Sequence, residues 1–374
     1  MKKTASIFFC AAIIMAGAAF FGATAAEKPH HVYTEATDLT IFGKLMPGAT
    51  ANPYHRVDTT KYKGFTKSEN FQVRMTSGMG CAFRTNSRSI TVRTQYGQRS
   101  FPTNTNGFAA RGYDMYIRQG DSWLWAGSGV VSDNKPEATL TLCEEMDGTM
   151  HECIVYFPLY SEEYSIKIGV DQGAVIEPAP DPFRHRLAIF GSSYTHGSST
   201  SRAGMAYPAQ FSRATGLQML SLGCSGNCKL QDYFCTVLCD VDADAFIFDS
   251  FSNPNAEMIR ERLVPFIDRL IAAHPGKPLI FQQTIYRERR NFNGKVADYE
   301  QAKMDMASAI FKELRSTREG REKYKDVYFI TPDAVAPSHE ESVDGVHPGN
   351  YGYTLWAESI RKSIVKILSR YGIK

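Results

Sequence analysis

The sequence predicts a chain in two parts, an amino-terminal antiparallel β-sandwich followed by an α/β domain with a parallel sheet between layers of helices. From about His31 to Ile176, short apolar or alternating runs are separated by Gly, Asn, Asp and Pro clusters, which is typical of sandwiches. Later, near-continuous apolar runs alternate with helical patterns, as in parallel sheets covered on both faces. The proline-rich connector Glu177 to Pro182 separates the two patterns. We therefore expect domains at 27–180 and 181–374.

The sandwich is expected to be jelly-roll-like, because its strands are short and each is followed by a turn signal. The expected strands are Ser89 to Arg93, Tyr113 to Arg118, Trp123 to Ser128, Ala138 to Leu142, Ile154 to Leu159 and Tyr164 to Val170.

The second part is expected to be a flavodoxin-like three-layer α/β/α sandwich, because buried strands joined by helices form a parallel sheet through right-handed crossovers. The expected strands are Leu187 to Phe190, Met219 to Leu222, Ala245 to Phe248, Pro278 to Gln282 and Val327 to Ile330. The expected helices are Ala206 to Thr215, Lys229 to Cys239, Glu257 to Ala273, Tyr299 to Ser316 and Tyr351 to Tyr371.

The first 26 residues resemble a secretory signal peptide. Lys2 and Lys3 precede an apolar segment from Ile7 to Phe21, and small residues at 23–25 suit signal cleavage. The apolar segment is short for a bilayer span. We therefore expect a periplasmic or secreted protein with no stable membrane insertion after cleavage.

The composition is that of a globular protein with no strongly charged partner. Hydrophobic residues make up 43% and charged residues 22% of the chain, which excludes wholesale disorder. The formal charge of +3 falls to about +1 without the two leader lysines. A nucleic-acid partner is therefore not expected.

The cysteines suggest two structural hypotheses. Cys143 and Cys153 flank the turn signal Asp147-Gly148, so they would face each other, and could form a disulfide, if 140–146 and 150–157 form one hairpin. Cys224, Cys228, Cys235 and Cys239 have spacings that invite a metal site. Because the second pair falls on a helical pattern, we favour buried apolar cysteines and expect no metal.

Ser193 is the candidate nucleophile. The apolar run Leu187 to Phe190 stops at Gly191, and two serines follow before Gly197 closes a turn. A serine at the carboxyl end of a buried parallel strand points into the crevice where such sheets bind ligands. An ordinary serine-rich turn is the alternative.

A serine nucleophile requires a base and an acid that orients the base. Asp344 precedes His347 by three residues, so its carboxylate could hold one ring nitrogen while the other faces a serine. This loop follows the last expected strand and therefore opens onto the same edge of the sheet.

Two more strand ends carry groups that suit an oxyanion hole. The glycine turn at 223–227 can bring a backbone N–H close to a ligand. In the turn at 252–255, a side-chain amide from Asn253 or Asn255 can donate a hydrogen bond.

Four motifs resemble the blocks of the SGNH (GDSL-type) serine esterases, at Gly191 to Gly197, Ser221 to Gly226, Phe248 to Asn253 and Asp344 to Pro348. The chain is most similar to the two-domain bacterial group with an amino-terminal β-sandwich. Ser192 stands where the family has the Asp of its name. The third block lacks the usual Gly-x-Asn-Asp, so Asn255 stays an alternative to Asn253.

The resemblance implies specific roles for these residues. Ser193 would be the nucleophile, His347 the general base and then acid, and Asp344 the residue that orients His347. The backbone N–H groups of Ser193 and Gly226 and the amide of Asn253 would form the oxyanion hole. No cofactor or metal is implied.

The implied activity is hydrolysis of a carboxylic ester, with an O-acetylated carbohydrate or another small ester as substrate. A lipase or thioesterase acting on longer acyl chains and a non-catalytic glycan-binding protein are the alternatives. The run Arg287-Glu288-Arg289-Arg290 follows the fourth expected strand of the α/β domain. It would either meet an acidic sugar or form a solvated, self-paired cluster.

Overall fold

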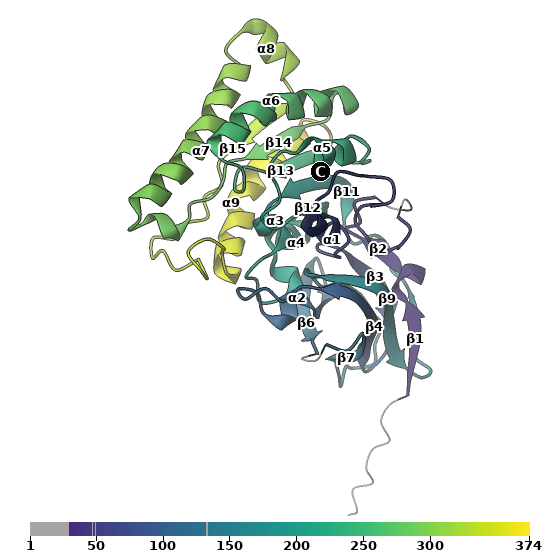
Figure 1. Ribbon diagram of the computed structural model, residues 1–374. Coiled ribbons are helices and arrows are strands. Elements are labelled where there is room, and N and C mark those ends of the chain that lie inside the picture. Colours follow the sequence, from purple (N-terminus) through teal and green to yellow (C-terminus); the bar gives the residue numbers. More distant parts are fainter. Residues whose placement is uncertain (1–29, 47, 49, 132–133) are drawn as a thin grey trace, which may run out of the picture.

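The computed structural model describes residues 30–46, 48, 50–131 and 134–374. The expected signal peptide at 1–26 lies outside this part of the chain. Two lobes are visible in Figure 1, a β-sandwich built from the first half of the chain and an α/β domain built from the second. Among the described residues, no helix combines the length and the hydropathy that crossing a bilayer requires.

The α/β domain has the predicted five-stranded parallel sheet. Its strand order is β12-β11-β13-β14-β15, and each neighbouring pair is parallel, which is the flavodoxin-like order. The strands are β11 (Arg184–Gly191), β12 (Leu217–Gly223), β13 (Ala245–Asp249), β14 (Leu279–Gln282) and β15 (Val327–Ile330). The expectation of a three-layer α/β/α domain is confirmed.

Helices cover both faces of this sheet because the buried strands present apolar side chains on alternate sides. On one face Phe190 and Phe248 pack with α5, α6 and α7, and on the other Leu187 and Ile247 pack with α4 and α9. The helices are α3 (Ser193–His196), α4 (Tyr207–Thr215), α5 (Asp232–Cys239), α6 (Ala256–Ala273), α7 (Gly294–Leu314), α8 (Arg318–Lys323) and α9 (Asn350–Ser369), with 3₁₀ turns η2 (Ala203–Met205) and η3 (Glu288–Arg290).

The amino-terminal half forms two antiparallel sheets with orders β1-β9-β4-β7 and β10-β3-β8-β5-β6, with β2 added beside β3. An apolar core that includes Phe83, Val92 and Ile168 fills the space between them. The elements are β1 (His31–Glu35), η1 (Ala36–Asp38), β2 (Thr40–Phe42), α1 (Lys67–Gln72), β3 (Gly80–Thr85), β4 (Ile90–Arg99), α2 (Gly107–Ala110), β5 (Tyr113–Gln119), β6 (Ser122–Gly129), β7 (Glu137–Cys143), β8 (His151–Tyr156), β9 (Ser161–Asp171) and β10 (Ile176–Pro178). The predicted sandwich is therefore present.

The hairpin predicted around Asp147-Gly148 is wrong. β7 pairs with β4 in one sheet, whereas β8 pairs with β3 and β5 in the other, so the turn passes from sheet to sheet. Cys143 and Cys153 do not face each other in a ladder, and all seven described cysteines are free thiols. Cys224, Cys228 and Cys235 are buried in the apolar core of the α/β domain, as we favoured, whereas Cys239 is only partly buried against that core.

The chain between β2 and β3 reaches out of the sandwich and covers the α/β domain. Leu45, Val57 and Val73 belong to the same apolar core as β12 and α5. Arg56, fully buried, donates from Nε to Met75 O at 2.7 Å and from Nη1 to Ser221 O at 3.1 Å and Gly223 O at 3.2 Å. Burial lowers the pKa of Arg56 to about 10. The two lobes therefore share one packed interface beside the carboxyl end of β12.

Candidate active site

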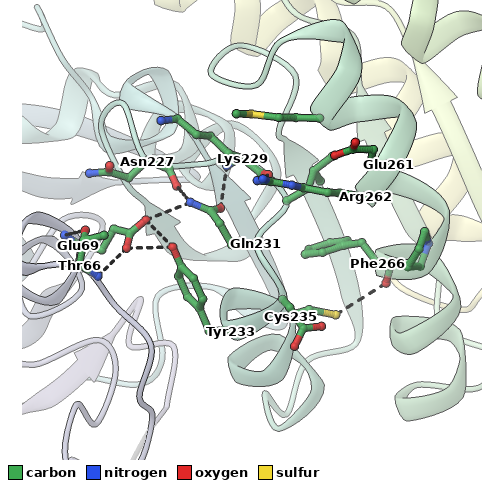
Figure 2. A pocket seen from close by; sticks show the side chains of 14 residues that line it. Thr66, Glu69, Asn227, Lys229, Gln231, Tyr233, Cys235, Glu261, Arg262 and Phe266 are labelled. Atoms are coloured by element: carbon green, nitrogen blue, oxygen red, sulfur yellow. Dashed lines mark hydrogen bonds between the residues drawn. The ribbon is translucent and has the colours of Figure 1, made fainter.

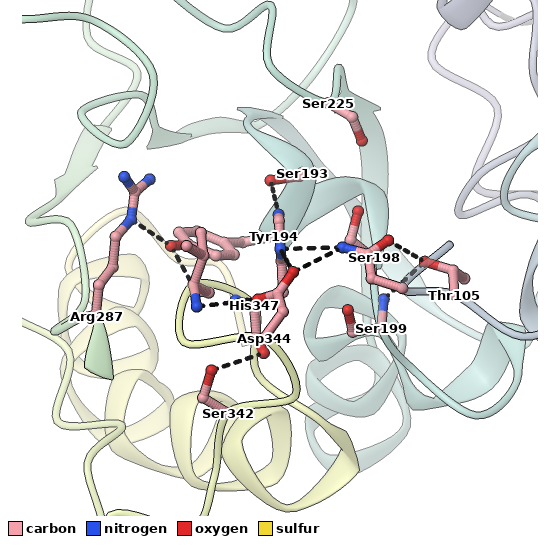
Figure 3. Close-up of polar contacts among 12 residues, drawn as sticks. Thr105, Ser193, Tyr194, Ser198, Ser199, Ser225, Arg287, Ser342, Asp344 and His347 are labelled. Carbon is pink, nitrogen blue, oxygen red and sulfur yellow. Dashed lines mark hydrogen bonds and ion pairs between the residues drawn. The ribbon is translucent and has the colours of Figure 1, made fainter. Parts of the chain in front are cut away.

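Ser193 stands where β11 ends, as the sequence predicts. Ser192 caps α3 by accepting a hydrogen bond from Tyr194 N, so Ser193 is the first residue of the helix. Its hydroxyl lies 2.9 Å from His347 Nε2 (Figure 3). The side chain lines a cleft at the carboxyl edge of the sheet.

His347 and Asp344 lie in the loop between β15 and α9. Asp344 Oδ1 accepts hydrogen bonds from the backbone N–H groups of Val346, at 2.9 Å, and His347, at 2.7 Å. Asp344 Oδ2 lies 2.8 Å from His347 Nδ1. With Nδ1 protonated toward this carboxylate, Nε2 is the acceptor for the Ser193 hydroxyl. The structure thus brings together Ser193, His347 and Asp344 in the arrangement of a serine-hydrolase triad.

The environment of Asp344 favours its ionised form. Burial on its own would raise the pKa of this carboxyl, but hydrogen bonds from the His347 backbone, the Asn104 amide and the imidazole outweigh burial and hold the pKa well below its usual value. Asp344 is therefore a carboxylate at neutral pH.

The expected oxyanion donors line the same cleft. No intrahelical carbonyl can accept from the N–H of Ser193, because it begins α3. Gly226 adopts a left-handed φ of 73°, and no carbonyl of the described residues accepts from its N–H. Asn253 accepts from Cys228 N through Oδ1 at 3.2 Å, which leaves its Nδ2 group as the donor.

Asn255, the alternative to Asn253, does not line the cleft. Its side chain caps α6 by accepting from Met258 N at 2.8 Å. The geometry therefore favours Asn253 as the amide donor.

Asp249 supports the turn that carries the nucleophile. Its Oδ2 accepts from Ser192 N at 3.2 Å, Ser192 Oγ at 3.0 Å and Thr195 Oγ1 at 2.9 Å. Complete burial raises the pKa of Asp249 to about 6, even though the hydrogen bonds from Thr195 and Ser192 oppose the rise. Our sequence analysis gave Asp249 no role, although its position at the end of an expected strand could have indicated one.

The sandwich lobe contributes Asn104 to the triad. Asn104 Nδ2 donates to Asp344 Oδ2 at 3.0 Å and lies 3.1 Å from His347 Nδ1. The residue precedes α2 in a loop of the sandwich. The sequence analysis missed it, because an Asn between two Thr residues reads as an ordinary turn.

Tyr160, also from the sandwich lobe, holds the glycine turn next to Gly226. Its hydroxyl lies 2.7 Å from Ser225 Oγ, and its ring stacks on His196 with centroids 4.1 Å apart. Ser225 Oγ lies 3.2 Å from His196 Nδ1, and His196 Nε2 lies 2.6 Å from Leu159 O. Burial, with help from Arg56, lowers the pKa of His196 to about 3, so the ring is neutral. This network fixes the turn that carries one expected oxyanion donor.

The cleft is a polar groove of about 740 Å³ between the lobes. The sandwich side includes Phe71, Asn104 and Tyr160, and the α/β side includes the triad and several cations. Its lining residues are Ser68, Phe71, Gln72, Met75, Ser100, Pro102, Asn104, Tyr160, Ser193, Ser198, Ser225, Gly226, Lys229, Ser252, Asn253, Arg287, Arg289, Tyr299, Lys303, Asp344, Val346 and His347.

A neighbouring cavity of about 620 Å³ lies between α1, α5 and α6 and shares Lys229 with the cleft (Figure 2). One of its carboxylates, that of Glu69, accepts from Tyr233 OH at 2.8 Å and from Gln231 Nε2 at 2.9 Å. Because Glu69 also closes the capping box of α1, we assign this group a structural role.

Among the described residues, one group could hold a metal ion. Glu288, His339 and Glu341 have ligand atoms within 4.8 Å of one another. Glu288 already pairs with His339 at 2.9 Å, and none of the three lines the cleft.

Both halves of the chain match known families. Residues 184–365 match the GDSL-like lipase/acylhydrolase family, and residues 31–176 match a family described as the N-terminus of SGNH-hydrolase-type esterases. No curated protein matches the chain.

Solved structures resemble the chain over both lobes. A Bacteroides ovatus protein described as a GDSL-like lipase is 33% identical, with a TM-score of 0.85, over 91% of this chain and 98% of that one. A family two carbohydrate esterase from Cellvibrio japonicus is 13% identical, with a TM-score of 0.58 over 91% and 98%. An acetyl xylan esterase from Butyrivibrio proteoclasticus is 11% identical, with a TM-score of 0.53 over 91% and 99%. At these lower identities the likeness concerns the fold alone.

Proposed function

Because the chain belongs to the GDSL-like lipase/acylhydrolase family, we propose that it removes O-acetyl groups from carbohydrate through an acyl-enzyme. The observation that carries the proposal is the chain of contacts from Ser193 Oγ to His347 Nε2, at 2.9 Å, and from His347 Nδ1 to Asp344 Oδ2, at 2.8 Å. In this proposal Ser193 is the nucleophile, His347 the general base and Asp344 the residue that orients His347.

The reaction proceeds in two halves. His347 Nε2 takes the hydroxyl proton as Ser193 Oγ attacks the ester carbonyl, and the same proton then passes to the departing sugar oxygen. The acyl group stays on Ser193 until water, deprotonated by His347, attacks it. Acetate leaves and the proton returns to Ser193, so the enzyme is unchanged.

The negative charge that develops on the carbonyl oxygen needs fixed donors. The N–H groups of Ser193 and Gly226 and the Nδ2 group of Asn253 supply them from three strand ends. Fixed donors of this kind contribute more to catalysis than water does, because they need no reorganisation as charge develops.

The cleft supports a short acyl group on a polar alcohol. Serine, asparagine and cationic side chains make up more than half of its lining residues. Structures of carbohydrate esterases share the two-lobed fold, which is consistent with this choice of substrate.

We further propose that the protein is exported through the segment at 1–26 and acts in the periplasm or outside the cell. An exported esterase would encounter polymeric and oligomeric glycan esters in these compartments. Amino-terminal sequencing of the protein recovered outside the cytoplasm tests this point, since an intact Met1 would refute it.

The test of the activity is a profile of kcat/KM on nitrophenyl esters from acetate to decanoate. We expect activity confined to the shortest esters, loss of activity in Ser193→Ala, and unchanged activity in Ser316→Ala, an exposed serine in the turn after α7. Rates that rise with chain length would instead indicate a lipase. Equal rates in Ser193→Ala and the parent would remove Ser193 from the mechanism.

A further inference from the structure

The cleft carries an excess of positive charge. Lys229, Arg287, Arg289 and Lys303 line it, and Asp344 is its one carboxylate among the described residues. Asp344 is already committed to His347 and Asn104. A substrate therefore meets cations that the triad does not use.

Two of these cations are held by the protein itself. Arg287 Nη1 lies 2.8 Å and Lys303 Nζ 2.7 Å from opposite oxygens of Glu300. Both also donate to the carbonyl of Ser252, at 2.8 and 3.1 Å. These contacts brace the loop before Asn253. Because these two cations share one carboxylate, the group of Arg287, Lys303 and Glu300 keeps a net positive charge.

Arg289 has no such partner. Within the described residues, no carboxylate lies within 4.0 Å of its guanidinium and no hydrogen bond involves its side chain, which is exposed. Its backbone is fixed, since its N–H donates to Gly345 O at 2.8 Å. The Arg289 guanidinium therefore extends from a backbone position that is hydrogen-bonded to Gly345, the residue that follows Asp344.

The other charges of this segment are engaged. Arg287 pairs with Glu300, Glu288 pairs with His339 at 2.9 Å, and Arg290 donates to Gln301 at 2.9 Å. The charged neighbours of Arg289 therefore have their partners outside the run 287–290, so the run is not self-paired.

Lys229 is the second unpartnered cation, on the wall that carries Gly226 and Asn253. Its backbone N–H donates to Gln231 at 2.8 Å and its carbonyl accepts from Arg262 at 3.0 Å. No carboxylate in the described part of the chain forms an ion pair with its ammonium group, and Figure 2 shows no dashed line from that group to a carboxylate.

A side cavity of about 330 Å³ continues the cleft past Arg289. Arg287, Arg289, Tyr299 and Val346 line both spaces, and Lys295 lies beyond them. The Tyr299 side chain is half-exposed. An aromatic face beside cations offers a sugar ring both a stacking surface and a partner for an acidic substituent.

We propose that the substrate is an ester of an acidic sugar, and that Arg289 binds the carboxylate of that sugar while Lys229 strengthens the positive field in the same cleft. The proposal rests on the proposed esterase function. A guanidinium matches a carboxylate in a two-point geometry, whereas a neutral glycan would leave both cations with water alone. Cations in a cleft also attract anionic substrates, and salt screens this attraction.

The test compares two substrates that differ in charge alone, a mono-O-acetylated methyl glucuronoside and the acetylated amide of the same uronic acid. At low salt we expect kcat/KM to favour the acid by about tenfold or more. Raising NaCl to 0.5 M should shrink the preference. Arg289→Gln should reduce the acid-to-amide ratio to about threefold, and Arg289→Gln with Lys229→Gln should bring it close to one.

Arg361→Gln, an exposed arginine on α9 away from the cleft, is the matched control and should keep the parent ratio. Equal rates on acid and amide in the parent would overturn the proposal. So would an Arg289→Gln variant that loses both rates equally. Nitrophenyl acetate separates the two proposals, because its hydrolysis with no acid preference refutes this inference alone, whereas inactivity on all three esters refutes the esterase function itself.

Discussion

Replacing Asn104 with alanine tests whether the sandwich lobe positions the proposed catalytic groups. The change removes the 3.0 Å hydrogen bond from Asn104 Nδ2 to Asp344 Oδ2. Hydrogen bonds to charged groups contribute about 1.5–3 kcal/mol. Because the Asp344 side chain is 31% exposed, water replaces part of the loss, so we take the lower end.

A loss of about 1.5 kcal/mol corresponds to about a tenfold fall in kcat. We expect KM on nitrophenyl acetate to change little, since the amide acts through Asp344 and His347. Asn104→Asp should be slower than Asn104→Ala, because it puts a second carboxylate about 3 Å from the first. The assay is steady-state kinetics of both variants at neutral pH.

Asn106→Ala is the matched control. Asn106 caps α2 by accepting from Ala109 N at 3.0 Å and does not line the cleft. Its loss should cost about 1 kcal/mol of stability with kcat unchanged. If Asn104→Ala keeps the kcat of the parent, or if both variants lose kcat equally, the inferred positioning role of Asn104 is wrong.

Two further predictions concern the strand ends. Asn253→Ala should lower kcat by about a hundred- to a thousandfold, whereas Asn255→Ala should keep kcat and lose about 1 kcal/mol of stability with the α6 cap; the reverse pattern would reassign the donor. The Asp249 carboxyl titrates near pH 6 when folded and near pH 4 when unfolded. Between these values the folded state binds the extra proton, so the free energy of unfolding should fall by roughly 2–3 kcal/mol as the pH rises from 4 to 7. Urea unfolding of the parent and of Asp249→Asn across this range isolates this contribution, which should be missing from the variant. A pH dependence that is the same in both proteins would count against the assignment.

The site residues that could be predicted from the sequence are those that directly follow buried parallel strands. Ser193, Asn253 and the loop of Asp344 and His347 follow apolar runs, and parallel strands bring their carboxyl ends to one edge. The structure places all of them, with Gly226, around one cleft.

What could not be predicted depends on contacts between distant segments. An alternating pattern marks a strand but not its sheet, which is why the hairpin around Asp147 was wrong. Likewise, nothing in the spacing of 43–75 indicated that this stretch leaves the sandwich for the core of the α/β domain. Asn104 and Tyr160 reach the site through the same docking of the lobes.

Arg56 also constrains the order in which the molecule can form. Its guanidinium bonds to the carbonyls of Ser221 and Gly223, which are 165 and 167 residues further along the chain. During synthesis, Arg56 therefore cannot form these hydrogen bonds until β12 has been synthesised and has left the ribosome. Contacts of such separation slow folding and leave apolar surface uncovered meanwhile. The catalytic edge of the sheet is thus completed late, by a segment that was made first.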